Sequence, residues 1–371
     1  MLAKIEISNF KNFKENFVFD LSKANSFAFN KECVKNNIVN KAIVYGHNGS
    51  GKSNLGFAIF DLISHLTDKR TEPSYYKNYF NADLNSNIAK FNFEFIFDDN
   101  IVEYRYTKSD NKTLVSEELI INNNEYFHIN KVQSSIFRTT AKGAENLKKD
   151  LGESNISIVN YLSKNTILEN NKENRIFEEF KKFVNKMLYF RVLDDKSYMG
   201  LEQTNHIIEH DIVDRNNLAD FEQFLNDAGI VCNLISKKDS FNKNNIFMKF
   251  QNRELEFFEV ASSGTKSLAL FYFWYQRLKE ENSVSFLFID EFDAFYHHSL
   301  SKTLVEKLKE LIDVQVVLTT HNTSIISNEL LRPDCYFLMY PNKITSLSKS
   351  TTKELREAHN IEKMYRAGFF E

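Results

Sequence analysis

Proline and cysteine are scarce in this sequence of 371 residues. It holds 3 prolines and 3 cysteines, and no two cysteines form a CxxC pair. Such cysteine usage favours neither a disulfide framework nor a zinc site, and it indicates a reducing, cytoplasmic setting. Proline is too rare for a proline-rich linker array, whereas 35 phenylalanines and 16 tyrosines favour a well-packed globule that contains strands.

A long apolar run and an excess of one charge are also lacking. The longest apolar run, residues 268–275, is far too short to span a bilayer, and the first six residues already carry charges. We therefore expect no targeting segment and no membrane partner. Because 47 Lys and Arg nearly balance 50 Asp and Glu, the net charge of −3 does not indicate a bulk nucleic-acid binder, although a local basic face stays open.

Residues 1–134 predict an N-terminal lobe with a strand, a loop and a helix, followed by an antiparallel meander. Apolar spacing indicates strands at residues 2–10 and 42–45, and a helix at residues 53–66 that starts directly after a glycine-rich turn. Alternation with a period of two indicates further strands. These lie at residues 90–97, 101–106, 114–121 and 126–129. The paired acids at 98–99 and 194–195 are interpreted as turns, because no catalytic framework accompanies them.

The rest of the chain divides into a helical insertion and a C-terminal lobe. Residues 135–236 have mostly helical spacing and lack the sustained heptads of a coiled-coil arm. Residues 237–371 return to strands that alternate with helices, which predicts a largely parallel sheet. The expected elements of this lobe are a hairpin at 246–260, helices at 265–279 and 300–312, strands at 284–289 and 315–319, and a short helix after His321.

A glycine-rich octet carries the strongest chemical signal. It fits the P-loop (Walker A) pattern G-x-x-x-x-G-K-[ST] between an expected strand and an expected helix. Its glycines let backbone N–H groups surround a phosphate, and we expect Lys52 to reach the β- and γ-phosphates of ATP while Ser53 ligates Mg²⁺. A coincidental glycine turn is the alternative. The expected nucleotide contacts are Gly46, His47, Asn48, Gly49, Ser50, Gly51, Lys52, Ser53 and the adjoining Asn54.

An apolar strand that ends in two carboxylates is the second signal. Residues 286–289 are apolar, and Asp290 and Glu291 follow where a P-loop ATPase places its metal ligand and its water-activating base. We expect Asp290 to hold Mg²⁺ through water, and Glu291 to orient or deprotonate the attacking water. A merely solvated strand end is the alternative, which the P-loop disfavours.

Two shorter patterns complete an order of motifs that resembles a known family. The sequence Ser-Ser-Gly-Thr-Lys, with Ser263 and Gly264, begins an expected helix, where Ser263 or Thr265 is also an ordinary N-cap. His321 follows the strand at 315–319, and a polar loop residue is the alternative there. P-loop, serine-glycine signature, Asp-Glu pair and histidine, in this order, resemble the ATP-binding-cassette (ABC) ATPases, including the SMC and RecF heads.

The ABC resemblance implies an α/β P-loop NTPase fold with an antiparallel β meander and a helical insertion, and a site shared by two copies. In that family the signature of one subunit closes on the γ-phosphate bound by the other. Ser263 and Gly264 would thus contact ATP in trans, in a homodimer or larger assembly, and His321 would contact the γ-phosphate. The family also carries a glutamine that senses Mg²⁺, for which Gln133 is the candidate here.

The run from Asp290 to His298 narrows the resemblance. It is similar to the E-x-x-x-x-[LY]-H run of the OLD-like ATPases, which are stand-alone or nuclease-fused ATPases of bacterial anti-phage and abortive-infection operons. The opening residues 5–13 are similar to the same group and add Lys11 and Asn12 as nucleotide contacts. Since the chain ends soon after its last expected strand, we expect no fused nuclease. His297 and His298 favour structural or dimer-surface roles over a metal site.

These resemblances imply an Mg-dependent ATP hydrolase that acts as an ATP-switched cytoplasmic dimer. We expect the sensor or regulatory ATPase of an antiviral defence system, which passes its state to a separately encoded effector protein, with nucleic-acid binding left open. One alternative is a DNA-bridging or repair ATPase of RecF or SMC type, in which ATP closes a basic groove on duplex DNA. A second is the ATP-binding subunit of a membrane transporter, which the run from Glu291 to His298 disfavours.

Overall fold

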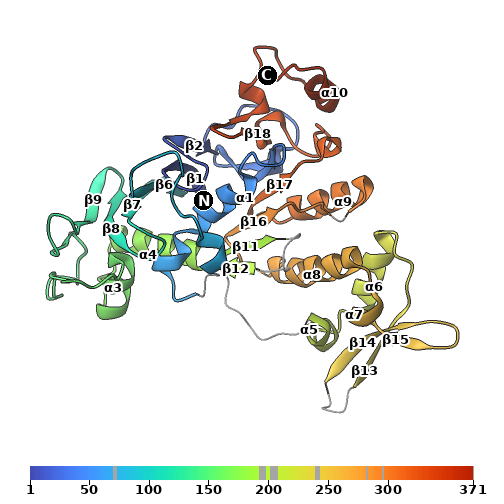
Figure 1. Ribbon diagram of the computed structural model, residues 1–371. Helices are drawn as coiled ribbons and strands as arrows, with labels where there is room; N and C mark the ends of the chain where they lie inside the picture. Colours follow the sequence, from blue (N-terminus) through green and yellow to red (C-terminus); the bar gives the residue numbers. More distant parts are fainter. Residues whose placement is uncertain are drawn as a thin grey trace.

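Two seven-stranded sheets and a helical lobe make up the part of the chain that the computed structural model describes (Figure 1). This part comprises residues 1–69, 73–191, 198–200, 208–238, 243–280, 283–294 and 296–370. Within these ranges no helix is long and apolar enough to cross a membrane. The predicted turn at 98–99 is confirmed between two strands, whereas the predicted turn at 194–195 lies outside the described residues.

The antiparallel sheet is the predicted meander, extended by strands from the N-terminus. In spatial order it consists of β10 (Arg138–Thr139), β9 (Asn124–Asn130), β8 (Leu114–Ile121), β7 (Asn100–Lys108), β6 (Ala89–Phe97), β1 (Leu2–Ser8) and β2 (Phe17–Asp20). Helices α3 (Ile158–Asn165) and α4 (Lys172–Asn185) accompany it (Figure 1). Rings of α4 meet the buried face at Phe95, which packs edge-on against Phe180 and Phe183.

The parallel sheet contains the P-loop strand β5 (Lys41–Tyr45) between two other parallel strands. In spatial order it consists of β12 (Tyr198–Gly200), β11 (Met187–Arg191), β16 (Phe286–Asp290), β17 (Gln315–Thr320), β5 (Lys41–Tyr45), β18 (Tyr336–Tyr340) and β19 (Lys343–Ser346). Strands β11, β16, β17, β5 and β18 run parallel, and the two edge strands run antiparallel to their neighbours. The parallel sheet predicted for the C-terminal lobe is thereby confirmed.

Strand β11 corrects the expectation that residues 135–236 are helical throughout. It pairs in parallel with β16, so this range contributes a strand to the central sheet as well as helices. Residues 187–190 are an apolar, buried run. A short run of this kind cannot be distinguished from the continuation of an apolar helix by periodicity, and α4 directly precedes it.

The helix predicted at residues 53–66 is interrupted. Helix α1 (Lys52–Phe60) ends before Asp61, and α2 (Ile63–Leu66) follows after a tight turn with an i to i+3 hydrogen bond from Asp61 N to the Ala58 carbonyl oxygen at 3.3 Å. The Asp61 carboxylate is buried and accepts from Lys108 Nζ at 2.7 Å and from the hydroxyl of Tyr106 at 2.9 Å. The turn therefore ties the P-loop helix to the meander.

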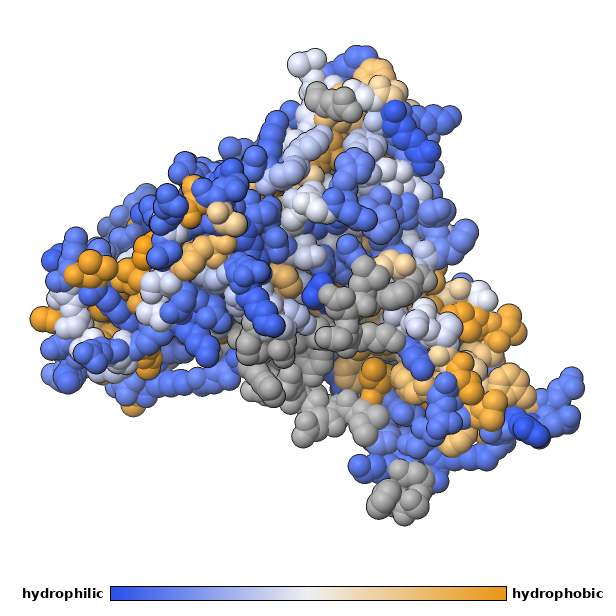
Figure 2. Space-filling model, viewed as in Figure 1, coloured by the Kyte–Doolittle hydropathy of each residue, from blue (hydrophilic) through white to orange (hydrophobic). Residues whose placement is uncertain are grey.

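A third lobe is built around α8, below the parallel sheet in Figure 1. Its elements are α5 (Ile208–Asp214), α6 (Leu218–Asp227), α7 (Phe257–Val260), α8 (Ser263–Leu278), and a small antiparallel sheet of β13 (Leu234–Lys238), β14 (Asn244–Lys249) and β15 (Glu254–Glu256). The Arg277 guanidinium on α8 makes hydrogen bonds to both carboxylate oxygens of Asp211 on α5, at 2.8 and 2.6 Å. Figure 2 shows hydrophobic side chains on this lobe, where Phe250, Leu255 and Val260 are exposed.

The remaining elements close the C-terminal side of the molecule. They include α9 (His298–Lys309), the 3₁₀ turn Thr323–Ile325 in place of the short helix expected after His321, α10 (Ile361–Arg366), and a two-stranded ribbon of β3 (Val34–Lys35) and β4 (Ile38–Val39). Gln315 joins the two large sheets, because its amide donates to the Leu2 carbonyl oxygen at 2.8 Å and accepts from Leu2 N at 2.9 Å. Both sheets thus contribute to one continuous core.

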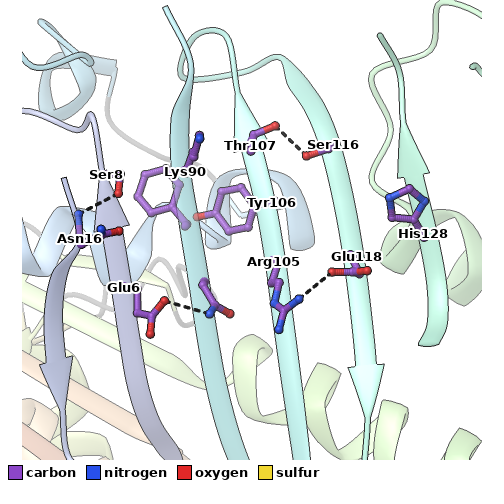
Figure 3. Close-up of a pocket in the computed structure, with 12 residues that line it drawn as sticks. Glu6, Ser8, Asn16, Lys90, Arg105, Tyr106, Thr107, Ser116, Glu118 and His128 are labelled. Atoms are coloured by element: carbon purple, nitrogen blue, oxygen red, sulfur yellow. Dashed lines mark hydrogen bonds and ion pairs between the residues drawn. The ribbon is translucent and has the colours of Figure 1, made fainter. Parts of the chain in front are cut away.

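The outward face of the meander is polar and largely self-satisfied. Burial alternates along β6, so that its phenylalanines enter the core while Asn92 and Glu94 face outward. A shallow cavity of about 300 Å³ on this face brings Glu6, Arg105 and Glu118 close together (Figure 3). Arg105 pairs with Glu118 at 3.3 Å across the strands, and Glu6 accepts from Asn92 at 3.2 Å.

Candidate functional site

The P-loop joins β5 to α1 and bends through two glycines. Gly49 and Gly51 have φ angles of 81° and 101°, in the left-handed region that side chains disfavour. A Cβ atom added to Gly51 would lie 2.5 Å from Asn12 Nδ2, whereas one added to Gly49 would meet no atom within 4 Å. The loop is therefore packed from behind at Gly51 and faces open space at Gly49.

The lysine of the loop is folded back onto its own backbone. Lys52 is only 5% exposed, and its Nζ donates to the carbonyl oxygens of Gly46 at 2.8 Å and His47 at 3.3 Å. Burial lowers the pKa of Lys52, although carboxylates nearby oppose this effect. Ser50 Oγ is also buried, without a hydrogen-bond partner among the described residues. A charged donor and an orphaned hydroxyl thus lie within one loop.

The two carboxylates expected to be catalytic lie at the end of β16. Asp290 is 3% exposed, and its Oδ1 accepts from the Thr319 hydroxyl at 2.7 Å. The same Thr319 oxygen accepts from Glu291 N at 2.8 Å, and Glu291 has a left-handed φ of 49°. Burial and the charge of Asp290 raise the pKa of Glu291, while nearby cations oppose the rise. One threonine on β17 therefore fixes the position of both acids.

Arg191 is a neighbour of the site that the sequence did not reveal. It ends β11 in register with Asp290, and its Nε lies 3.7 Å from Asp290 Oδ2. Its guanidinium also lies 5.6 Å from the ring centroids of Phe57 and Tyr75. No local pattern marks this arginine, because its position beside Asp290 depends on the pairing of β11 with β16.

These elements enclose a cavity of about 400 Å³ at the carboxyl ends of the parallel strands. The P-loop, the end of β16 and the residue after β17 all line it. The predicted residues that the structure brings together here are Asn48, Gly49, Gly51, Lys52, Ser53, Asn54, Glu291 and His321. Asp290 stands behind Glu291, in contact with Thr319 and Arg191.

Other predicted contacts lie outside this cavity. Asn12 contacts a residue that lines the cavity, since its Oδ1 accepts a hydrogen bond from Asn54 Nδ2 at 2.6 Å. Lys11 Nζ donates a hydrogen bond to the Lys77 carbonyl oxygen at 3.2 Å. Gln133 lies in an exposed turn after β9. It does not line the cavity, and the position beside Asp290 is held by Arg191.

The serine-glycine signature starts α8 and does not line the cavity of its own chain. Ser263 is exposed at the first turn of the helix, followed by Gly264. The N-cap is Ser262, whose Oγ accepts from Thr265 N at 3.2 Å, so neither Ser263 nor Thr265 caps the helix as expected. The Ser263 side chain is thus available on the surface rather than used in capping.

The two histidines after the carboxylates have different surroundings. His297 is the N-cap residue of α9, while His298 Nδ1 lies 3.0 Å from Ser324 Oγ and 3.1 Å from Asn322 Nδ2. Asn322 also donates to the buried Asp293, whose pKa burial raises. Across the described ranges no group of three His, Cys, Asp or Glu side chains could hold a metal ion.

A comparison with protein families gives a match over most of the chain. The matching family is described as "AAA domain, putative AbiEii toxin, Type IV TA system", and the match covers residues 41–327. This span includes the P-loop, Asp290, Glu291 and His321. No curated protein matches the chain.

Solved structures of SMC heads resemble the fold at low identity. One is the SMC head bound to the C-winged helix domain of ScpA, with 15% identity, a TM-score of 0.47, and coverage of 94% of this chain and 98% of the other. The SMC head domain from Thermotoga maritima has 13% identity, a TM-score of 0.45 and coverage of 93% and 98%. The Smc head domain with an extended coiled coil, bound to the C-terminal domain of ScpA derived from Pyrococcus furiosus, has 14% identity and a TM-score of 0.46. The match covers 94% of this chain and 97% of the other.

Proposed function

The chain belongs to the family of AAA domains whose match spans residues 41–327, and from this premise we propose that it binds and hydrolyses Mg-ATP in the cavity at the P-loop. One observation carries the proposal: Lys52, Ser53 and Glu291 converge on a single cavity of about 400 Å³. Glu291 is far in sequence from the adjacent Lys52 and Ser53, and the three residues meet at the carboxyl ends of parallel strands, where open α/β sheets bind their ligands.

The P-loop binds the phosphates in this proposal. Its N–H groups and the N-terminus of α1 surround them, and Lys52 exchanges two neutral carbonyl partners for the β- and γ-phosphates. Gly46, His47 and Ser50 shape the loop, and the buried Ser50 hydroxyl has no hydrogen-bond partner among the described residues. Asn12 holds Asn54 in place beside it.

The oxygen donors present suit Mg²⁺. Ser53 offers a hydroxyl and Asp290 a carboxylate, which are the hard ligands that this ion prefers, and the remaining positions are left for water and phosphate. Mg²⁺ held there would neutralise the charge that develops on the phosphate oxygens. The neighbouring Arg191 shares the Asp290 carboxylate, so this arginine limits how many carboxylate oxygens remain for the metal.

Glu291 acts as the base that orients or deprotonates water. Its raised pKa makes it a better proton acceptor than an ordinary glutamate, as a general base requires. Thr319 restrains its backbone at 2.8 Å, and His321 completes the cavity as a contact to the γ-phosphate. These assignments account for the buried carboxylates beside the P-loop without any further catalytic group.

Lys52→Ala tests the binding assignment. The variant should lose the thermal stabilisation that Mg-ATP gives the wild type, because it removes the phosphate-facing cation and leaves the loop glycines intact. Lys90→Ala, an exposed lysine on the meander, serves as the matched control and should keep the stabilisation. Equal stabilisation of Lys52→Ala and wild type would contradict the assignment.

A site shared between two copies is the second part of the proposal. Ser263 is exposed and unused as a cap, which suits a contact with the γ-phosphate bound by another copy, together with Gly264. ATP would then lie in the interface and stabilise association by mass action. The mass in solution of Glu291→Gln should increase with Mg-ATP, and adding Ser263→Arg should prevent it, whereas Ser134→Arg on the meander should not. A mass indifferent to nucleotide and to Ser263→Arg would sink the shared site.

We further infer that the ATPase is OLD-like and regulates a separately encoded effector of an anti-phage system. The support is the run from Asp290 to His298, which is similar to that of the OLD-like ATPases. The purified chain should hydrolyse ATP but not cleave nucleic acid. Metal-dependent nuclease activity that survives rigorous purification would overturn this inference.

A further inference from the structure

A second cavity borders the P-loop at His47. It has a volume of about 870 Å³ and lies between the β18–β19 hairpin, residues 349–353 and residues 365–370. It shares no lining residue with the cavity that contains Lys52 and Glu291. Its size falls within the range of about 300 to 1,000 Å³ that small-molecule sites occupy.

The lining of this second cavity is basic. Lys343, Lys349 and Lys353 contribute side chains to it, and none of its described lining residues is an aspartate or a glutamate. All three lysines are exposed, and within the described residues none pairs with a carboxylate. Partial burial lowers the pKa of Lys349, while the charge of Asp20 opposes this effect. The charges therefore differ from those on the meander, where Arg105 is neutralised by Glu118 (Figure 3).

Exposed aromatic rings line the same cavity. Tyr340 and Phe369 are each 40% exposed, and both line this cavity. Lys353 Nζ lies 4.1 Å from the centroid of the Phe369 ring. Tyr365 is fixed against Tyr45 of the P-loop strand, with ring centroids 5.0 Å apart. Rings and ammonium groups thus face one space.

We propose that this cavity binds a nucleoside phosphate separate from the ATP of the P-loop. The phosphate would lie against Lys343 and Lys353, and the base would stack on Tyr340 or Phe369. The hydroxyls of Thr351 and Thr352, which also line the cavity, supply further hydrogen-bond donors to phosphate oxygens, whereas the Ser350 hydroxyl already donates to the Ser346 carbonyl oxygen at 2.9 Å. A purely apolar ligand would leave the lysines unpaired, and an inorganic anion would leave the rings uncovered.

This chemistry has two natural sources, a free nucleotide or the unstacked end of a single strand. A duplex is excluded from the rings, because its bases are already stacked on one another. The proposal does not depend on ATP hydrolysis. A ligand in the second cavity would lie against His47, at the start of the P-loop, and therefore next to the proposed ATP site.

Binding assays with two probes test the proposal. Guanosine 5′-monophosphate represents the free nucleotide, and a short 5′-phosphorylated oligothymidylate represents the strand end. Neither carries the β- and γ-phosphates that the P-loop grips. The affinity of at least one probe should fall about ten-fold or more in Lys343→Glu/Lys353→Glu, and about ten-fold in Tyr340→Ala/Phe369→Ala, since stacking on one ring has roughly that value.

Controls separate this site from general charge and from the P-loop. Lys90→Glu changes the net charge on the meander and should leave probe affinity unchanged, as should Lys52→Ala, which removes ATP binding. For the oligothymidylate, the logarithm of the binding constant should fall linearly with the logarithm of the salt concentration. The slope of this line should be less steep in the double lysine variant than in wild type, by about 0.7 for each phosphate that the variant no longer neutralises. This slope is measured on folded protein at every salt concentration.

The outcomes decide the proposal. If the cavity variants lose affinity for the monophosphate but not for the oligothymidylate, the ligand is a free nucleotide. If they lose affinity for the oligothymidylate but not for the monophosphate, the ligand is a strand end. If wild type binds neither probe at low salt, or if Lys90→Glu weakens binding as much as the double lysine variant, the proposal is overturned. Loss of binding in Lys52→Ala without loss in the cavity variants would also overturn it, because the probe would then be in the P-loop.

Discussion

Charged residues are arranged differently on the two seven-stranded sheets. On the outward face of the antiparallel sheet, charges meet opposite charges, as Arg105 does with Glu103 and Glu118. At the carboxyl ends of the parallel sheet, Glu291 and Asp290 lie beside each other, and Lys52 donates to carbonyl oxygens rather than to a carboxylate. Charges in the first region are paired with opposite charges, whereas those in the second region would be compensated by a bound ligand.

This difference separates structural from functional charge. Burial of an ionised group is costly unless a partner compensates its charge. Two carboxylates that lie close together therefore destabilise the fold, and such arrangements are typical of functional sites. The buried pair of Asp61 and Lys108, at the junction of P-loop helix and meander, is the structural kind. In the proposed function, the Asp290 and Glu291 pair is the functional kind.

Lys108→Met should have the largest effect on stability, and it tests the structural side of the comparison. Both partners of the Lys108–Asp61 pair are 0% exposed, and the substitution leaves the buried carboxylate to its tyrosine hydroxyl partners. We expect a loss of about 3–5 kcal/mol in the free energy of unfolding, measured by chemical denaturation. The matched control is Lys164→Met, which breaks an exposed lysine–aspartate pair and should change stability by about 1 kcal/mol or less. Similar losses in both variants would contradict the argument.

The pH dependence of hydrolysis tests the functional side. Burial, and then the charge of Asp290, raise the pKa of Glu291 above its ordinary value of 4.5. Because the base works as a carboxylate, kcat/KM should decrease as pH falls through this raised pKa, and the acid limb should lie above pH 4.5. Circular dichroism over the same range separates loss of activity from unfolding. An acid limb at or below the ordinary value would show that Glu291 is not the titrating base.

Arg105→Met should have the smallest effect. Arg105 is largely exposed on the meander, and exposed ion pairs contribute about 0–1 kcal/mol. We therefore expect nearly unchanged stability and an unchanged rate of ATP hydrolysis, followed by denaturation and by phosphate release. A marked loss of hydrolysis in this variant would mean that the polar face of the meander takes part in the reaction, and the comparison between the sheets would fail.

Local patterns were sufficient to predict the P-loop and the strands β1, β5 to β9 and β14 to β17, but not β2, β3, β4, β10, β11, β12, β13, β18 or β19. Alternation along residues 90–97 and 114–121 marks strands that are polar on one face, and the glycine octet is contiguous in sequence. Strand β11 was missed because its residues are buried on both faces and show no alternation. The break after α1 was missed because no glycine or proline marks residues 60–63, and the contact of Asp61 with Lys108 joins residues far apart in the chain.

The candidate site was predictable where a motif is contiguous and hidden where it depends on strand pairing. Asn48, Gly49 and residues 51–54, together with Glu291 and His321, were expected from sequence, and they line one cavity. Arg191 and Thr319 contact Asp290 only because β11 and β17 flank β16 in the sheet. The basic cavity at His47 arises in the same way, from a hairpin and C-terminal residues that no pattern connects.

ATP turnover by Glu291→Gln is the measurement that tests the central claim most directly. The variant keeps the shape of the side chain and removes the base, so hydrolysis should fall about 10²- to 10⁴-fold while Mg-ATP binding is retained. Glu306→Gln, an exposed glutamate on α9, should hydrolyse ATP at the wild-type rate. Wild-type turnover by Glu291→Gln, with Mg-ATP bound, would contradict the account.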